Sequence, residues 1–269
     1  MKRVTVFAEG SHYTDPKRDR TAFDDLWKLL LAKCGVVDRR CVRVIGFSKD
    51  QLVAVRPPPK FQSCRNLALD MEIKRAYDRE AFDVLVIAFD LIPKHNALMA
   101  ACRRQEVEQL LLGLCDRANL PPPLLKAAEA LLAHYRTCWA KKQQTGSKGK
   151  ETFEPRPPQA LELLVMEPMF EALLLADERG FRNAIGLRRA PRGWRSFDLK
   201  GIKKPDQEII LPAFSLAPKN IRILVDSNDK HQIAELVLRK LPEDSAAWRH
   251  EIVARLRRLV NRTGRPLPV

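Results

Sequence analysis

The sequence lacks any apolar run long enough to cross a bilayer as a helix, which takes about 20 consecutive residues. It also lacks the pattern of a secretory signal, because Glu9 and His12 interrupt the apolar stretch nearest the N-terminus. We therefore expect a cytoplasmic protein with no membrane partner.

The sequence also lacks the cysteine patterns of a zinc site or of a redox-active Cys-x-x-Cys pair. None of the six cysteines belongs to a Cys-x-x-Cys pair, and no histidine stands at a zinc-like offset from two of them. Reduced and mostly packed thiols are expected, because a disulfide framework is foreign to a cytosolic chain of 269 residues. No Walker-type Gly-x-x-x-x-Gly-Lys segment occurs, so any ATP-driven step would need a partner ATPase.

What the chain has in excess is positive charge, with a formal net charge of +15. Residues 182–204 carry eight basic side chains against one acid, and residues 249–265 carry six against one. Clustered arginine and lysine suit a phosphate backbone, so these two segments predict a nucleic-acid partner. A solvated basic face without a partner is the alternative.

Short apolar runs alternate with helical patterns along the chain. Such alternation predicts an α/β fold, with a mainly parallel sheet flanked by helices. We expect one domain over 1–269, with a helical insertion at about 97–160 and a basic C-terminal part at about 180–269. Thr21 and Asp24 form a capping box for the first helix, and Lys141–Pro158 is an expected loop or linker. The expected strands are 4–8, 42–47, 84–89, 161–166 and 221–225, and the expected helices lie near 22–33, 65–79, 97–117, 122–140, 229–240 and 245–262.

A carboxylate follows four of these apolar runs: Glu9, Asp90, Glu167 and Asp226. Functional groups gather at the carboxyl ends of strands in an open parallel sheet, so these acids could converge on one edge and hold a hard cation. The alternative is that each acid marks the point where a strand leaves the core. Gly10, directly after Glu9, allows a sharp turn and a close approach of the backbone to a ligand.

The Glu9-Gly10 pair, Asp90 after the central strand, and the segment Glu167-Pro-Met-Phe-Glu171-Ala-Leu-Leu-Leu-Ala-Asp177 together resemble the Toprim fold. More narrowly, they resemble a Toprim-related family encoded beside ATPases in bacterial defence loci. The resemblance covers about residues 1–10 and 80–180. It implies a Mg²⁺- or Mn²⁺-dependent enzyme that cleaves or joins phosphodiesters of nucleic acids. Toprim enzymes carry Asp-x-Asp after the central strand, whereas here Ile92 occupies the second position.

The resemblance implies Glu9 as general acid or base, Asp90 as the main metal ligand beside Glu9, and Glu167 or Glu171 as a supporting acid. The alternative to an enzyme is a catalytically degenerate subunit that binds a partner. Ile92, in the place of the second aspartate, favours this alternative. Trp194 either packs like the other tryptophans or stacks on a base between arginines. The side chains expected to neutralise phosphates are Arg188, Arg189, Arg192, Arg195, Arg257 and Arg258.

Overall fold

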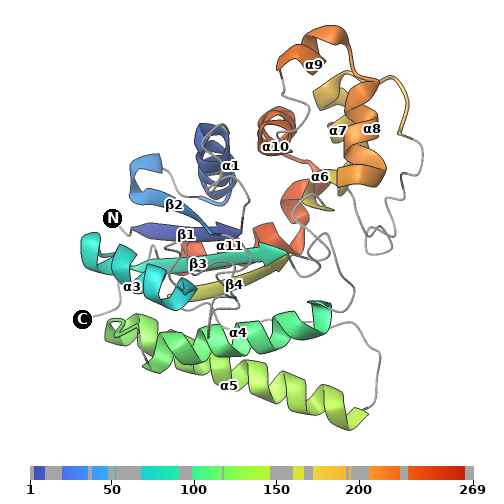
Figure 1. Cartoon of the computed structure of the whole chain (residues 1–269). Helices are drawn as coiled ribbons and strands as arrows, with labels where there is room; N and C mark the ends of the chain where they lie inside the picture. The colour runs from blue at the N-terminus through green and yellow to red at the C-terminus, as the bar shows by residue number, and fades with distance from the viewer. Residues whose placement is uncertain are drawn as a thin grey trace, which may run out of the picture.

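The computed structural model places a parallel sheet of four strands at the centre of the protein, in the order β2-β1-β3-β4 (Figure 1). The strands are β1 (Val4–Glu9), β2 (Val42–Phe47), β3 (Val84–Asp90) and β4 (Leu161–Met166). The structure describes residues 3–9, 20–35, 38–47, 52, 68–90, 99–116, 118–145, 160–166, 172–191, 194, 206–224 and 230–263.

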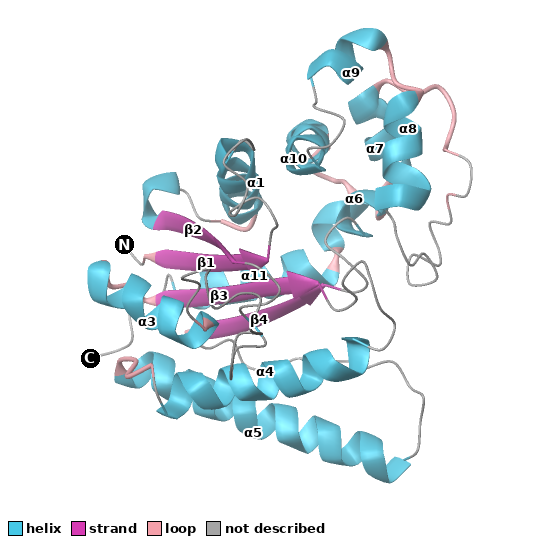
Figure 2. Ribbon diagram, viewed as in Figure 1, coloured by secondary structure: helices cyan, strands magenta, loops and turns pink. Residues whose placement is uncertain are grey.

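Helices cover both faces of the sheet, because successive strand residues point to opposite sides and both sets are apolar. Val4 and Val6 of β1 belong to the core beneath α1 (Arg20–Lys33) and α11 (Glu251–Thr263). Phe7 belongs to the second core. That core lies on the other face of the sheet, which a second set of helices covers (Figure 2). The helices of that second face are α3 (Leu69–Arg79), α4 (Met99–Asp116) and α5 (Pro122–Thr145).

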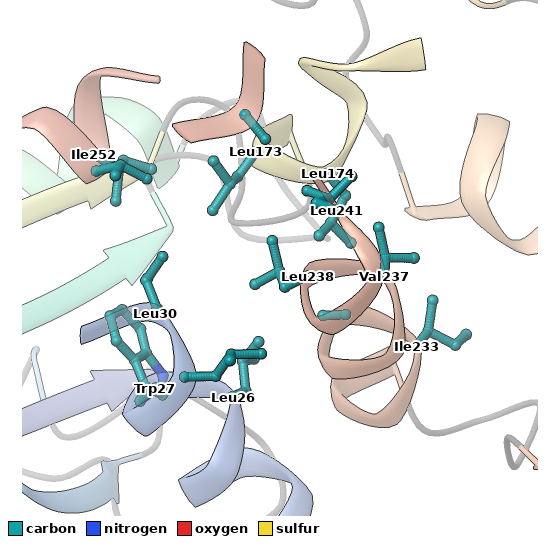
Figure 3. Close-up of a cluster of buried hydrophobic side chains, with 14 of the residues drawn as sticks. Leu26, Trp27, Leu30, Leu173, Leu174, Ile233, Val237, Leu238, Leu241 and Ile252 are labelled. Atoms are coloured by element: carbon teal, nitrogen blue, oxygen red, sulfur yellow. The ribbon is translucent and has the colours of Figure 1, made fainter. Parts of the chain in front are cut away.

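A group of short helices, α6 to α10, stands beside this three-layer body, and we call it the helical lobe (Figure 1). It attaches through α10, which packs along α1. Figure 3 shows Leu238 on the side of α10 that is turned toward Leu26 and Leu30 of α1, and these side chains are buried. The elements of the lobe are α6 (Ala172–Leu175), α7 (Glu178–Ile185), the π-helical turn η5 (Asp206–Ile210), α8 (Leu211–Ser215), α9 (Lys219–Leu224) and α10 (Lys230–Lys240).

Polar contacts fix the lobe and α11 in place. Asp177 caps α7 by accepting from the Gly180 N–H at 2.8 Å, and its other oxygen accepts from the buried Ser245 hydroxyl. On β4, the buried carboxylate of Glu162 pairs with Arg255 of α11. Arg255 also donates to the carbonyl of Leu163 at 2.8 Å, which satisfies a backbone group on the outer strand.

The predicted α/β class is confirmed, and four of the five predicted strands are present within a residue of their expected ends. The fifth is wrong, because residues 221–224 belong to α9. Ile221 is buried while Arg222 is exposed, and Pro218 precedes the first turn, as suits a short amphipathic helix. A short apolar run cannot be assigned to strand or helix by periodicity alone.

Two smaller differences concern helix ends. Helix α1 begins at Arg20, so Thr21 lies in its first turn and does not precede it. Helix α5 continues to Thr145, so residues 141–145 are helical and only the later part of the expected loop falls outside the described residues. Two short helical segments, η2 (Arg39–Cys41) and η6 (Ala246–Arg249), complete the set. Within the described residues, none of the helices is both long and apolar enough to span a membrane.

Candidate functional site

The strand order creates a topological switch point between β1 and β3. From β1 the chain passes through α1 to β2 on one side, whereas from β3 it passes through α4 and α5 to β4 on the other side. The connections that leave the two central strands therefore diverge. A crevice forms at the carboxyl ends of neighbouring strands where this happens, and ligands of open α/β sheets bind there.

Glu9 and Asp90 are the last residues of those two strands. The strands are parallel with Ala8 opposite Ala88, so both acids lie at the same edge of the sheet. The backbone N–H of Asp90 donates to Glu9 Oε2 at 3.1 Å, and both residues are half-buried. Their placement on adjacent strands at one edge is as the sequence predicts.

The hydrogen bond orients the Glu9 carboxylate across the end of β3. A carboxylate held by a backbone N–H loses freedom of rotation, so the position of this group at the edge of the sheet is defined. The two apolar strands behind it have little freedom to shift, since residues 84–89 are buried at both faces of the sheet. Both acidic residues therefore extend from a rigid part of the sheet.

Glu9 and Asp90 are the described acids at this edge that could contribute ligands to a magnesium or manganese ion. Mg²⁺ is usually bound by one or two carboxylates, with water and substrate phosphates completing six positions. Across the described ranges no group of three or more His, Cys, Asp or Glu side chains forms a closed metal site. An ion held by Glu9 and Asp90 would therefore keep open positions for a phosphate. Glu167, Glu171 and Asp226 lie outside the described residues.

The described arginines of the prediction lie apart from this edge. Arg188 and Arg189 are exposed and follow α7 in the helical lobe. Arg257 lies near Cys34, which directly follows α1 on the way to β2, so it belongs toward the opposite edge of the sheet. Arg258 is its exposed neighbour on α11. Arg192 and Arg195 are outside the described residues.

Trp194 is half-buried against the core of the lobe. Its ring centroid lies 5.2 Å from that of Phe181, which in turn packs edge-on against Phe214 at 6.4 Å. This packing accounts for the tryptophan as a structural residue of the lobe. Base stacking by Trp194 stays a prediction.

Two basic residues of α9 were not predicted from the sequence as part of a nucleic-acid-binding surface. Lys219 and Arg222 are exposed and belong to the end of the lobe where Pro218 lies against Gly186. They fall outside the most basic window of the sequence, and the strand wrongly predicted at 221–225 concealed their helical spacing. A helical reading of residues 219–224 would have placed them on one surface.

Cys34 is buried beside α11, with its Sγ 3.8 Å from the carbonyl oxygen of Val253, and plays no part in the site. Burial raises the pKa of its thiol to about 12, and the nearby Arg257 opposes that shift only weakly. The thiol is therefore neutral and unreactive at physiological pH.

Comparison of this chain with protein-family models, with curated proteins and with solved structures finds no match.

Proposed function

We propose that this chain is a Toprim-like, metal-dependent nuclease or nucleic-acid-binding effector of bacterial antiphage defence, and that it works with a partner ATPase. The observation that carries the proposal is the pairing of Glu9 and Asp90 at the carboxyl ends of the two central strands, joined by the hydrogen bond from Asp90 N–H to Glu9. The resemblance of the strand-end motifs supports the defence setting and the ATPase partner.

The chemistry follows from the two side chains. Asp90 and Glu9 would hold Mg²⁺ or Mn²⁺, which when bound polarises a phosphodiester and stabilises charge on its oxygens. Glu9 would also orient an attacking water or accept its proton, since its carboxylate is already positioned by the N–H of Asp90. Exposed arginines such as Arg188 and Arg189, in the lobe apart from this edge, would bind phosphates further along the nucleic acid. Glu167 or Glu171 would supply a supporting acid.

A second candidate is a degenerate subunit that binds nucleic acid or a partner without cleaving. It is favoured by Ile92, which stands where a second metal-binding aspartate belongs in Toprim enzymes, and by the absence of a three-acid group in the described part of the chain. Fold similarity alone does not bring activity with it.

A cleavage assay separates the two candidates. The purified chain is incubated with Mg²⁺ or Mn²⁺ and either supercoiled plasmid or labelled single-stranded RNA, alongside Glu9→Gln and a control, Glu129→Gln. Glu129 is exposed on α5, which covers the face of the sheet opposite α1. Its variant therefore makes the same Glu-to-Gln change away from the candidate site. We expect Glu9→Gln to lower the rate at least about 100-fold, the scale of a lost general acid or base, and the control to cleave normally.

The other outcomes are equally informative. Cleavage that survives Glu9→Gln would refute the assignment of the site. A chain that binds nucleic acid but cleaves with neither metal would support the degenerate subunit, and gain of cleavage in Ile92→Asp would then show that one missing ligand is the cause.

A further inference from the structure

We infer that the helical lobe carries a nucleic-acid-binding surface at the junction of α7 and α9, formed by Arg188 and Arg189 together with Lys219 and Arg222. The inference rests on the proposed function only for the chemical nature of the partner, a phosphodiester backbone. It places that partner's main anchoring contacts on the lobe, separate from the acids at the edge of the sheet.

The junction is a close contact between two segments that are distant in sequence. Helix α7 ends at Gly186, whose backbone is left-handed with φ 73°, and a Cβ there would lie 3.2 Å from Pro218 Cγ. Arg188 and Arg189 follow Gly186 by two and three residues, and Lys219 directly follows Pro218. Exposed basic residues of both segments therefore lie close in sequence to this contact.

The turn that presents Arg188 and Arg189 is held by a third arginine. Arg182 donates to the carbonyl oxygen of Arg188 at 3.0 Å, and its guanidinium also pairs with Glu178 at 3.1 Å. Glu178 thereby neutralises Arg182, whose role is to position the turn. On the other segment, Arg222 donates to the carbonyl of Ser215 at 3.3 Å, which ties α9 to the end of α8.

The rigid turn and the charge excess favour a polyanion over a small anion. Arg188, Arg189, Lys219 and Arg222 are all exposed. Over residues 178–224 the sequence has 11 basic residues against four acids. Several separated cations on one exposed surface match the repeated charges of a phosphate backbone, and each contact releases counterions from the nucleic acid.

Fluorescence anisotropy in EDTA tests the surface without any cleavage. The labels are a 30-base-pair DNA duplex and a single-stranded 30-nucleotide RNA, each titrated from 50 to 200 mM salt. The variants are Lys219→Gln/Arg222→Gln and Arg188→Gln/Arg189→Gln. The matched control is Arg75→Gln/Arg79→Gln, which neutralises two exposed arginines of α3 on the opposite face of the sheet.

Each lobe variant should lower the slope of log K against log salt by about 1.8 for duplex DNA, or about 1.4 for RNA, since two phosphate contacts are lost. The unmodified protein would then lose about 12-fold more duplex affinity than the variant across this fourfold change in salt. The control should keep the full slope. Thermal melting of each variant checks that the fold is retained.

Equal slopes for the unmodified protein and Lys219→Gln/Arg222→Gln would overturn the inference, as would failure of the unmodified protein to bind either label. Equal slopes leave the proposed function untouched, because cleavage and its dependence on Glu9 are measured separately with metal present. A protein that binds neither label would count against the nucleic-acid-binding effector as well. The reverse also holds: loss of slope in the lobe variants with no cleavage by the chain would support the surface and refute the nuclease.

Discussion

The buried ion pair between Glu162 and Arg255 gives a stability prediction that the structure makes quantitative. Their side chains are 11% and 10% exposed, so the pair is nearly dry. Replacing Arg255 with methionine keeps much of the buried volume but leaves the Glu162 carboxylate without its cation, which costs about 3–5 kcal/mol. It also removes the donor to the Leu163 carbonyl, at 2.8 Å in the structure.

The double variant Arg255→Met/Glu162→Leu should recover most of that loss. An apolar pair replaces the ions, and the remaining cost is about 1–2 kcal/mol for the Leu163 carbonyl left without a partner. Urea unfolding of the unmodified protein, both single variants and the double variant forms a double-mutant cycle. We expect a coupling energy of at least about 2 kcal/mol. Single costs that add up to the double cost within about 0.5 kcal/mol would refute the reasoning.

Three further predictions concern packing and protonation. Gly180→Ala should destabilise the protein by about 1 kcal/mol or more in urea unfolding, because the new Cβ would lie 2.5 Å from Asp177 Oδ2 and 2.7 Å from Leu241 Cδ2; an unchanged midpoint would contradict this. Leu238→Ala should cost about 2–5 kcal/mol, since Leu238 is 0% exposed at the α1–α10 contact, whereas Leu216→Ala at 72% exposure should change stability by less than about 0.5 kcal/mol. The pKa of the Cys34 thiol rises from 9.0 to about 12, so between those pH values only the unfolded state ionises and stability falls as pH rises. The stability advantage of the unmodified protein over Cys34→Ala should therefore shrink from pH 8 to pH 10.5, and a constant difference would contradict the burial of the thiol.

The sheet was predictable because a strand that is buried on both faces forms an uninterrupted apolar run in the sequence. Val84 to Phe89 contains no polar residue, and the structure buries all of it. The run from Ile221 was also predicted as a strand although it includes Arg222, yet it forms α9, where Ile221 is buried and Arg222 is exposed. Short apolar runs carry no length or periodicity to separate these cases, so the tertiary surroundings decided.

The candidate site was predictable only in part. The position of Glu9 and Asp90 after apolar runs predicted that they end strands. The two acids lie close together because β1 and β3 are neighbours in the sheet. No local sequence pattern specifies that strand order. The basic surface was also not predictable from local patterns, since the segments that carry Lys219 and Arg188 are brought together by the contact between Gly186 and Pro218.

The central claim is that Glu9 and Asp90 hold a divalent cation together. Mn²⁺ binding measured by electron paramagnetic resonance tests it directly, because free Mn²⁺ gives a strong signal that is lost on binding. We expect binding by the unmodified chain, a loss of at least about tenfold in affinity in Asp90→Asn and in Glu9→Gln, and no change in Asp116→Asn, an exposed acid at the end of α4. Mn²⁺ affinity that is the same in all four proteins, or absent from the unmodified chain, would contradict the claim.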